Sequence, residues 1–140
     1  MSSTAPSMHA EAALNRRLVL FAKQLELYLG HFPNSHKYAL TQTIRQTFVD
    51  VYCLVVEAQK RYHKKTALGQ LDVRHEQLRM LLNLAFELGL FGHKTKNDDP
   101  LAGQHRYLTL SRMWDEVGRM VGGWIAKESG GREPVGAVGA

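Results

Sequence analysis

The chain has 140 residues, of which 44% are hydrophobic and 22% are charged. These values are typical of one globular domain and exclude disorder over the whole length. The net charge of +5 favours a polyanionic partner, either nucleic acid or an anionic membrane. The single cysteine, Cys53, excludes an intramolecular disulfide.

Features that would direct the chain out of the cytoplasm are missing from the sequence. No apolar run approaches the roughly 20 residues that a membrane-spanning helix needs. The polar N-terminus lacks the apolar core of a signal peptide. We therefore expect a cytoplasmic protein without a membrane partner. Cys53 lies within the string VYCLVV, so we predict a small buried core residue there and not a reactive thiol.

The first half of the chain predicts two helices after a disordered N-terminus at residues 1–10. Apolar residues three and four positions apart form one stripe of a helix. The first helix covers about residues 12–30, and its stripe consists of Leu14, Leu18, Phe21, Leu25, Tyr28 and Phe32. The second covers about 35–64, and its stripe consists of Ile44, Phe48, Val51, Val55, Ala58 and Tyr62. Its many valines would suit a strand, but the spacing and unbroken length favour a helix.

The second half predicts two more helices. The third covers about residues 67–91, and its stripe consists of Leu71, Leu78, Leu81, Leu82, Ala85 and Leu88. Residues 92–103 form a polar loop with Asp-Pro and two glycines. The fourth helix covers about 104–127, and its inward residues are Leu110, Met113, Trp114, Val117, Met120, Val121, Trp124 and Ile125. Residues 129–140 form a flexible glycine-rich tail.

Four amphipathic helices with short connections predict an all-α fold, an up-down-up-down antiparallel four-helix bundle spanning residues 11–128. The apolar stripes of the second and fourth helices are wider than one bundle core requires. We therefore expect a second buried surface, such as a subunit interface. Gly122 and Gly123 interrupt the fourth helix, which indicates close approach of another backbone or a kink.

Motifs of catalysis are missing. The sequence has neither a phosphate-binding glycine loop nor a nucleophile elbow. His75-Glu76 begins like a zinc-protease motif, but Arg79 stands where the second histidine ligand is needed. Asp72 and His75 have the spacing of the Glu-x-x-His pairs that bind two metals in helical bundles. The pair occurs only once in this sequence, so an exposed helical turn is the better interpretation. No arginine is followed by a histidine at the spacing of small helical ribonucleases. We therefore predict a protein that is not an enzyme and needs neither a cofactor nor a metal.

Positive charge is the remaining signal. It is densest at the end of the second helix, at Lys60, Arg61, Lys64 and Lys65. In an antiparallel bundle this cluster could merge with basic residues of the first and third helices, namely Arg16, Arg17, Lys23 and Arg74. Such a surface would bind phosphates without reading sequence. Alternatively, the lysines only complement the negative end of a helix dipole. If the cluster binds nucleic acid, charge reversal at its four positions should abolish binding and leave the bundle folded.

Three strings resemble a known family. HFPNSHKYALTQTIRQTF (31–48) and LDVRHEQLRMLLNLAFELGLF (71–91) are similar to the second and third helices of a bacterial four-helix bundle superfamily, which includes proteins encoded by intervening sequences in ribosomal RNA genes. LSRMWDEVGRMVGGWIAK (110–127) resembles the last helix of the accessory variability proteins (Avd) of diversity-generating retroelements. The resemblance covers about residues 12–127.

The resemblance implies a function and a set of partners. Proteins of this family are non-catalytic, form rings of five protomers, and bind nucleic acid and the reverse transcriptase of their element, which supports mutagenic retrohoming. It also implies packing or interface roles for the residues of the shared block, Arg119, Gly122, Gly123 and Trp124. We also predict that Trp124→Ala costs about 3–5 kcal/mol of stability, as the loss of a buried aromatic residue should. The alternative interpretation is an intervening-sequence-type bundle that binds ribosomal RNA.

Overall fold

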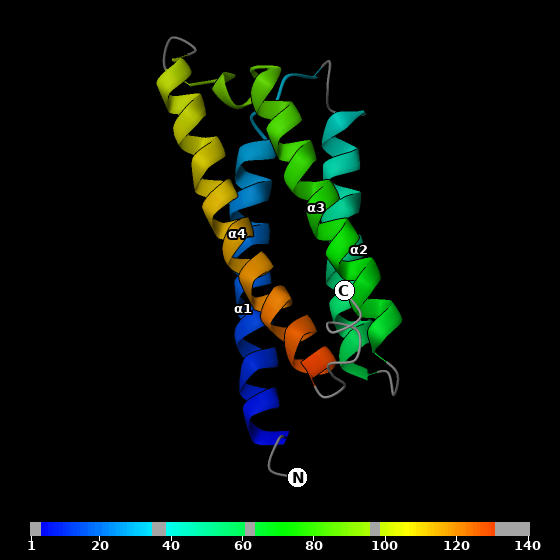
Figure 1. Cartoon of the computed structure of the whole chain (residues 1–140). Coiled ribbons are helices and arrows are strands. Elements are labelled where there is room, and N and C mark those ends of the chain that lie inside the picture. Colours follow the sequence, from blue (N-terminus) through cyan, green and yellow to red (C-terminus); the bar gives the residue numbers. More distant parts are fainter. Residues whose placement is uncertain (1–3, 35–38, 61–63, 96–98, 131–140) are drawn as a thin grey trace.

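The computed structural model describes residues 4–34, 39–60, 64–95 and 99–130 (Figure 1). These residues form four long helices, and they include no strand. The elements are α1 (Thr4–Leu29), α2 (Leu40–Lys60), α3 (Lys65–Glu87), the short 3-10 helix η2 (Leu90–Gly92) and α4 (Pro100–Gly130). The prediction of an all-α fold with four helices is confirmed.

The four helices lie lengthwise beside one another. The most extensive contacts join α2 to α3, α3 to α4 and α4 to α1, and the contact between α1 and α2 is smaller than these three. At the lower end of the bundle in Figure 1 lie the start of α1, the end of α2, the start of α3 and the end of α4. We call it the lysine-rich end, because it carries Lys60, Lys64, Lys65 and Lys127.

Each helix contributes its apolar stripe to one shared core. The buried residues of α1 are Leu14, Leu18, Phe21, Leu25 and Leu29, and those of the other helices follow the same three–four spacing. Trp114 of α4 is fully buried at the centre. Its ring lies 4.5 Å from that of Phe21 on α1, 6.1 Å from Phe48 on α2 and 4.7 Å from His75 on α3. One side chain thus contacts the other three helices, which fixes how α4 sits among them.

The helix α1 begins earlier than the sequence predicts. It starts at Thr4 and not at about residue 12, so residues 4–10 are helical although we expected disorder there. Pro6 stands in the first turn, where a proline needs no hydrogen-bond partner. Alanines follow it and favour a helix. The prediction missed this segment because the apolar stripe begins only at Leu14.

The predicted 92–103 loop is also shorter in the structure. Phe91 and Gly92 belong to η2, and α4 already starts at Pro100. The Asp99 carboxylate caps this helix by accepting a hydrogen bond of 3.0 Å from the Leu101 amide. Asp-Pro therefore acts here as an N-cap followed by a first-turn proline. At the end of α3, Gly89 has a φ of +78°, a left-handed conformation that glycine adopts without strain.

The remaining bounds differ by smaller amounts. The helix α2 runs from Leu40 to Lys60, and Lys64 is the N-cap residue that precedes α3. The predicted ends of the second helix, at 35–38 and 61–63, lie outside the described residues, as do Arg61, Tyr62 and most of the predicted tail. The helix α4 extends to Gly130, beyond the predicted end at 127.

Candidate nucleic-acid interface

The lysine-rich end is built by the short connection between α2 and α3. Lys60 is the last residue of α2, and Lys65 is the first residue of α3. Both are exposed, whereas Lys64 between them is half-buried. Lys127 reaches the same end from the last turn of α4. Lys127 is not among the predicted binding residues, although an antiparallel bundle would bring the end of α4 to this point.

The helix dipole explains only some of these lysines. Lys60 and Lys127 stand in last turns, where a positive charge complements the dipole. Lys64 and Lys65 stand at the start of α3, where the dipole disfavours positive charge. The first turn of α3 holds no acidic residue, and its N-cap residue, Lys64, makes no side-chain capping hydrogen bond. An anionic ligand at this end would relieve this unfavourable arrangement.

The pairing of the lysines leaves positive charge available. Lys64 Nζ lies 3.9 Å from the Glu128 carboxylate, a long and partly exposed ion pair. Within the described parts of the chain, Lys60, Lys65 and Lys127 have no carboxylate within ion-pair distance. Unpaired lysines on adjacent helix ends suit the phosphates of a nucleic-acid backbone.

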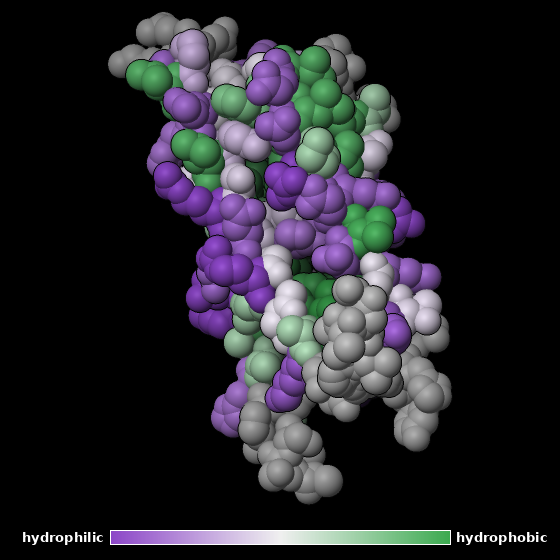
Figure 2. Space-filling model, in the orientation of Figure 1, coloured by the Kyte–Doolittle hydropathy of each residue, from purple (hydrophilic) through white to green (hydrophobic). Residues whose placement is uncertain are grey.

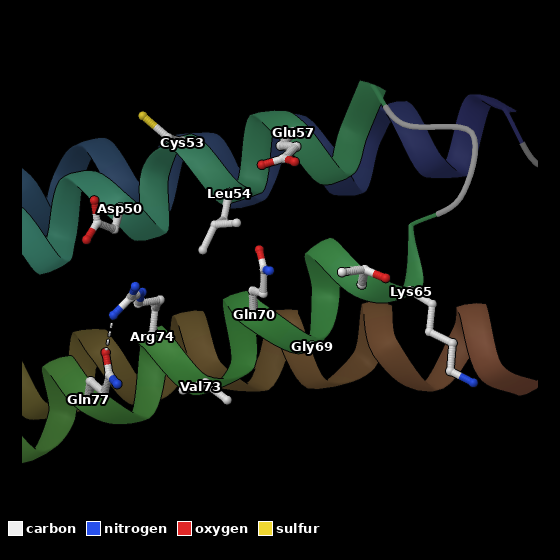
Figure 3. A pocket seen from close by; sticks show the side chains of 11 residues that line it. Asp50, Cys53, Leu54, Glu57, Lys65, Gly69, Gln70, Val73, Arg74 and Gln77 are labelled. Atoms are coloured by element: carbon white, nitrogen blue, oxygen red, sulfur yellow. Dashed lines mark hydrogen bonds between the residues drawn. The ribbon is translucent and has the colours of Figure 1, made fainter.

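Arg74 lines a groove of about 750 Å³ between α2 and α3, which Lys65 of the lysine-rich end also lines (Figure 3). Its guanidinium donates a hydrogen bond of 2.8 Å to Gln77. Asp50 and Glu57 line the opposite wall on α2, while the Lys65 side chain points away from them toward the end of the bundle (Figure 3). Because the groove carries carboxylates beside its cations, it is a poor phosphate site.

The basic residues of α1 face a different helix. Arg16, Arg17 and Lys23 are exposed, and α1 packs mainly against α4. On α4 the hydrogen bond and charge of Arg119 hold the pKa of the Glu116 carboxyl below its ordinary value, and the charge of Arg17 acts in the same direction. Glu116 thus partly neutralises two arginines. Arg17 lies on the α1–α4 side and Arg74 in the α2–α3 groove, so the structure spreads the predicted basic residues over more than one surface.

The small residues of α4 have different roles. A methyl group added to Gly118 would lie 2.6 Å from Cε1 of His75, so this glycine is required by packing against α3. Gly122 and Gly123 are exposed, and nothing within 4 Å would meet a Cβ at either position. Within the described chain, therefore, no neighbouring backbone explains this glycine pair. Arg119 is exposed and pairs with Glu116.

Two predictions about buried residues need correction. Cys53 is exposed, not buried. It is two residues away from both Val51 and Val55, and a separation of two residues corresponds to a rotation of about 200° around the helix axis. Its side chain is therefore on the opposite face from the two buried valines. Trp124 is only half-buried, and Trp114 is the tryptophan of the core. The predicted stability loss for Trp124→Ala is accordingly too large.

No group of three or more potential metal ligands occurs among the described residues. In the same part of the chain, no helix combines the length and apolarity that crossing a membrane requires.

The comparisons with known proteins concern nearly the whole bundle. A family model described as bAvd-like matches residues 12–128, in agreement with the extent of the resemblance in the sequence. No curated protein and no solved structure matches the chain. The family match spans well over half of the 140 residues and includes the lysine-rich end. This chain belongs to the bAvd-like family.

Proposed function

We propose that this protein is a non-catalytic accessory subunit of a diversity-generating retroelement. It binds the reverse transcriptase of the element and its template RNA or DNA in the cytoplasm, and so supports mutagenic retrohoming. The observation that carries the proposal is the bAvd-like match over residues 12–128, which includes the apolar faces of all four helices.

The lysine-rich end supports the nucleic-acid part of the proposal. Lys60, Lys65 and Lys127 come from three different helices, and Lys64 adds a fourth charge beside them. Contacts of this kind fix the position of a phosphate backbone and carry no sequence information. An accessory protein that handles different templates needs binding of this kind.

The assembly that we propose is a homopentamer of up-down-up-down antiparallel bundles. The end of each helix and the start of the next lie at the same end of the bundle, which supports the antiparallel topology (Figure 1). Exposed apolar side chains on two adjacent helices support self-association. They are Val49, Tyr52 and Val56 on α2, Val73, Met80 and Leu84 on α3, and Leu88 at the C-cap of α3. Figure 2 shows hydrophobic surface gathered over the later part of α3. The sequence predicts such a surface on the second and fourth helices, and we propose that α2 and α3 contribute to it.

The test is co-purification with the reverse transcriptase encoded beside this chain, followed by light scattering. We expect a complex of one polymerase with an oligomer of this protein. Absence of a complex, or a monomeric protein that binds only ribosomal RNA, would favour the intervening-sequence relatives and overturn the accessory role.

A further inference from the structure

A cavity of about 400 Å³ opens between α1 and α4 at the lysine-rich end. We call it the Trp124 pocket. Its apolar wall consists of Leu14, Met120 and Trp124, and its rim carries Lys64 and Lys127. The volume is in the range of pockets that hold small molecules. A hollow with an aromatic wall and cationic rim suits a ligand that is both flat and anionic.

The two tryptophans of α4 differ in how fully the fold uses them. Trp114 is buried, stacks on His75, and donates its indole N–H to the His75 carbonyl oxygen at 2.9 Å. Trp124 is half-buried, and among the described residues it has neither a hydrogen-bond partner nor a ring contact. Its indole is therefore available to a ligand in a way that Trp114 is not.

Gly123 adds no side chain to the pocket. It lines the cavity, and a Cβ at this position would meet nothing within 4 Å. Glycine inside a helix costs about 1 kcal/mol relative to alanine, and no contact within the described chain requires it here. Gly122 is also exposed without a neighbour, but it does not line the pocket. These two adjacent glycines therefore provide a matched pair of positions.

We propose that the Trp124 pocket takes one unpaired base of a single-stranded nucleic acid. The base stacks on the Trp124 ring, and Lys64 and Lys127 contact the phosphates on either side. Stacking on an aromatic side chain tolerates any base, because every base has a π-face. Glu11 and Glu128 also line the pocket, so charge attracts a strand only weakly at the pocket itself, and stacking decides the preference of the pocket for a base. This inference rests on the proposed nucleic-acid binding and adds a preference for unpaired strands.

The first experiment compares two ligands on the full chain: a single-stranded oligouridylate of about ten nucleotides and an abasic oligomer of equal length and charge. We expect the oligouridylate to bind about tenfold more tightly and to quench tryptophan fluorescence. Trp114 is buried, so quenching reports on Trp124, and Trp124→Phe should remove the signal. Equal affinity for the two oligomers overturns the pocket while leaving phosphate binding intact. Failure of both to bind overturns nucleic-acid binding itself.

The second experiment uses the glycine pair. Gly123→Leu adds a side chain to the lining of the pocket, and Gly122→Leu adds the same side chain at a position that does not line it; a Cβ at either position meets nothing within 4 Å. We expect Gly123→Leu to lose the roughly tenfold preference for the oligouridylate and Gly122→Leu to keep it, with unchanged circular dichroism in both. Equal behaviour of the two variants contradicts the proposal. The proposal is also contradicted if the reverse transcriptase quenches the fluorescence of Trp124 and the oligouridylate does not, because the pocket then contacts a protein.

Discussion

His75 and Trp114 exchange two hydrogen bonds across the contact of α3 with α4. The Trp114 indole N–H donates to the carbonyl oxygen of His75, and Nε2 of His75 donates to the carbonyl oxygen of Trp114, each at 2.9 Å. Because a carbonyl oxygen only accepts, His75 carries a proton on Nε2. The rings stack at 4.7 Å, and Gly118 leaves the space that the His75 ring occupies.

Replacing Gly118 with alanine should destabilise the protein. The added methyl group would lie 2.6 Å from Cε1 of His75, whose ring is held by the stack and hydrogen bond. We expect a net loss of about 1–3 kcal/mol, as for other overpacked sites, measured by urea unfolding. Gly122→Ala is the control: with nothing near its methyl group, it should stabilise by up to about 1 kcal/mol. Equal effects would mean that His75 moves aside without cost.

The two tryptophans should also differ in stability experiments. Trp114→Ala removes a buried ring that contacts three helices, so we expect a loss of about 3–5 kcal/mol. Trp124→Ala removes a half-buried ring, and about 1–2 kcal/mol is expected. Thermal unfolding followed by circular dichroism compares them. A larger loss for Trp124 would contradict the burial described above.

At the scale of elements, the start of α4 depends on one side chain. The Asp99 carboxylate accepts the hydrogen bond of the Leu101 amide, and the Asp99 carbonyl accepts that of Gly103. Gly103 in turn packs so closely on Gly92 that an added Cβ would lie 2.9 Å from the Gly92 backbone. The N-cap therefore also positions α4 against the segment that follows α3.

Asp99→Ala should lower the free energy of unfolding by about 1 kcal/mol, the usual cost of losing a side-chain N-cap. Asp99→Asn or Asp99→Ser keeps an acceptor and should recover most of that loss. Urea unfolding of the three variants gives the comparison. If alanine and serine behave alike, the hydrogen bond to Leu101 adds nothing to stability.

For the whole molecule, charge at one end should control nucleic-acid binding. Replacing Lys60, Arg61, Lys64 and Lys65 with glutamate should abolish binding at moderate salt, because phosphate contacts release counterions. A fluorescence-anisotropy titration measures it. Two double variants that change the net charge equally provide the control. The variant with Lys60→Glu and Lys65→Glu should weaken binding. The variant with Lys94→Glu and Arg112→Glu, at positions that are also exposed, should not. Equal weakening would assign binding to net charge alone.

The apolar side chains on α2 and α3 make a separate prediction about assembly. Met80→Glu and Leu84→Glu place charges on the exposed stripe of α3, where the wild-type residues are 53% and 46% exposed. We expect these variants to remain folded and to become monomeric by light scattering, because an unpaired charge is costly in an apolar interface. Leu101→Glu, at a 72% exposed position on α4, should leave the oligomer intact.

The sequence by itself determined the four helices and most of their buried faces. The spacing of Leu14, Leu18 and Phe21, and likewise of Leu110, Trp114 and Val117, reflects interactions within one or two helical turns. Such a pattern is visible without any knowledge of the neighbouring helix. The block around Gly118 also indicated the family, and the match over residues 12–128 confirmed it.

Only the tertiary structure decided which residue of each type has which role. His75 and Trp114 are 39 residues apart in the chain, so no local pattern shows that Gly118 is needed between them or that Gly122 is not. Trp114 and Trp124 both belong to the predicted inward stripe of the fourth helix, but only Trp114 meets the rings of three other helices. The grouping of Lys64, Lys127 and Trp124 around one cavity likewise depends on where helices distant in the sequence end. Contacts between helices, and not spacing along them, set these outcomes.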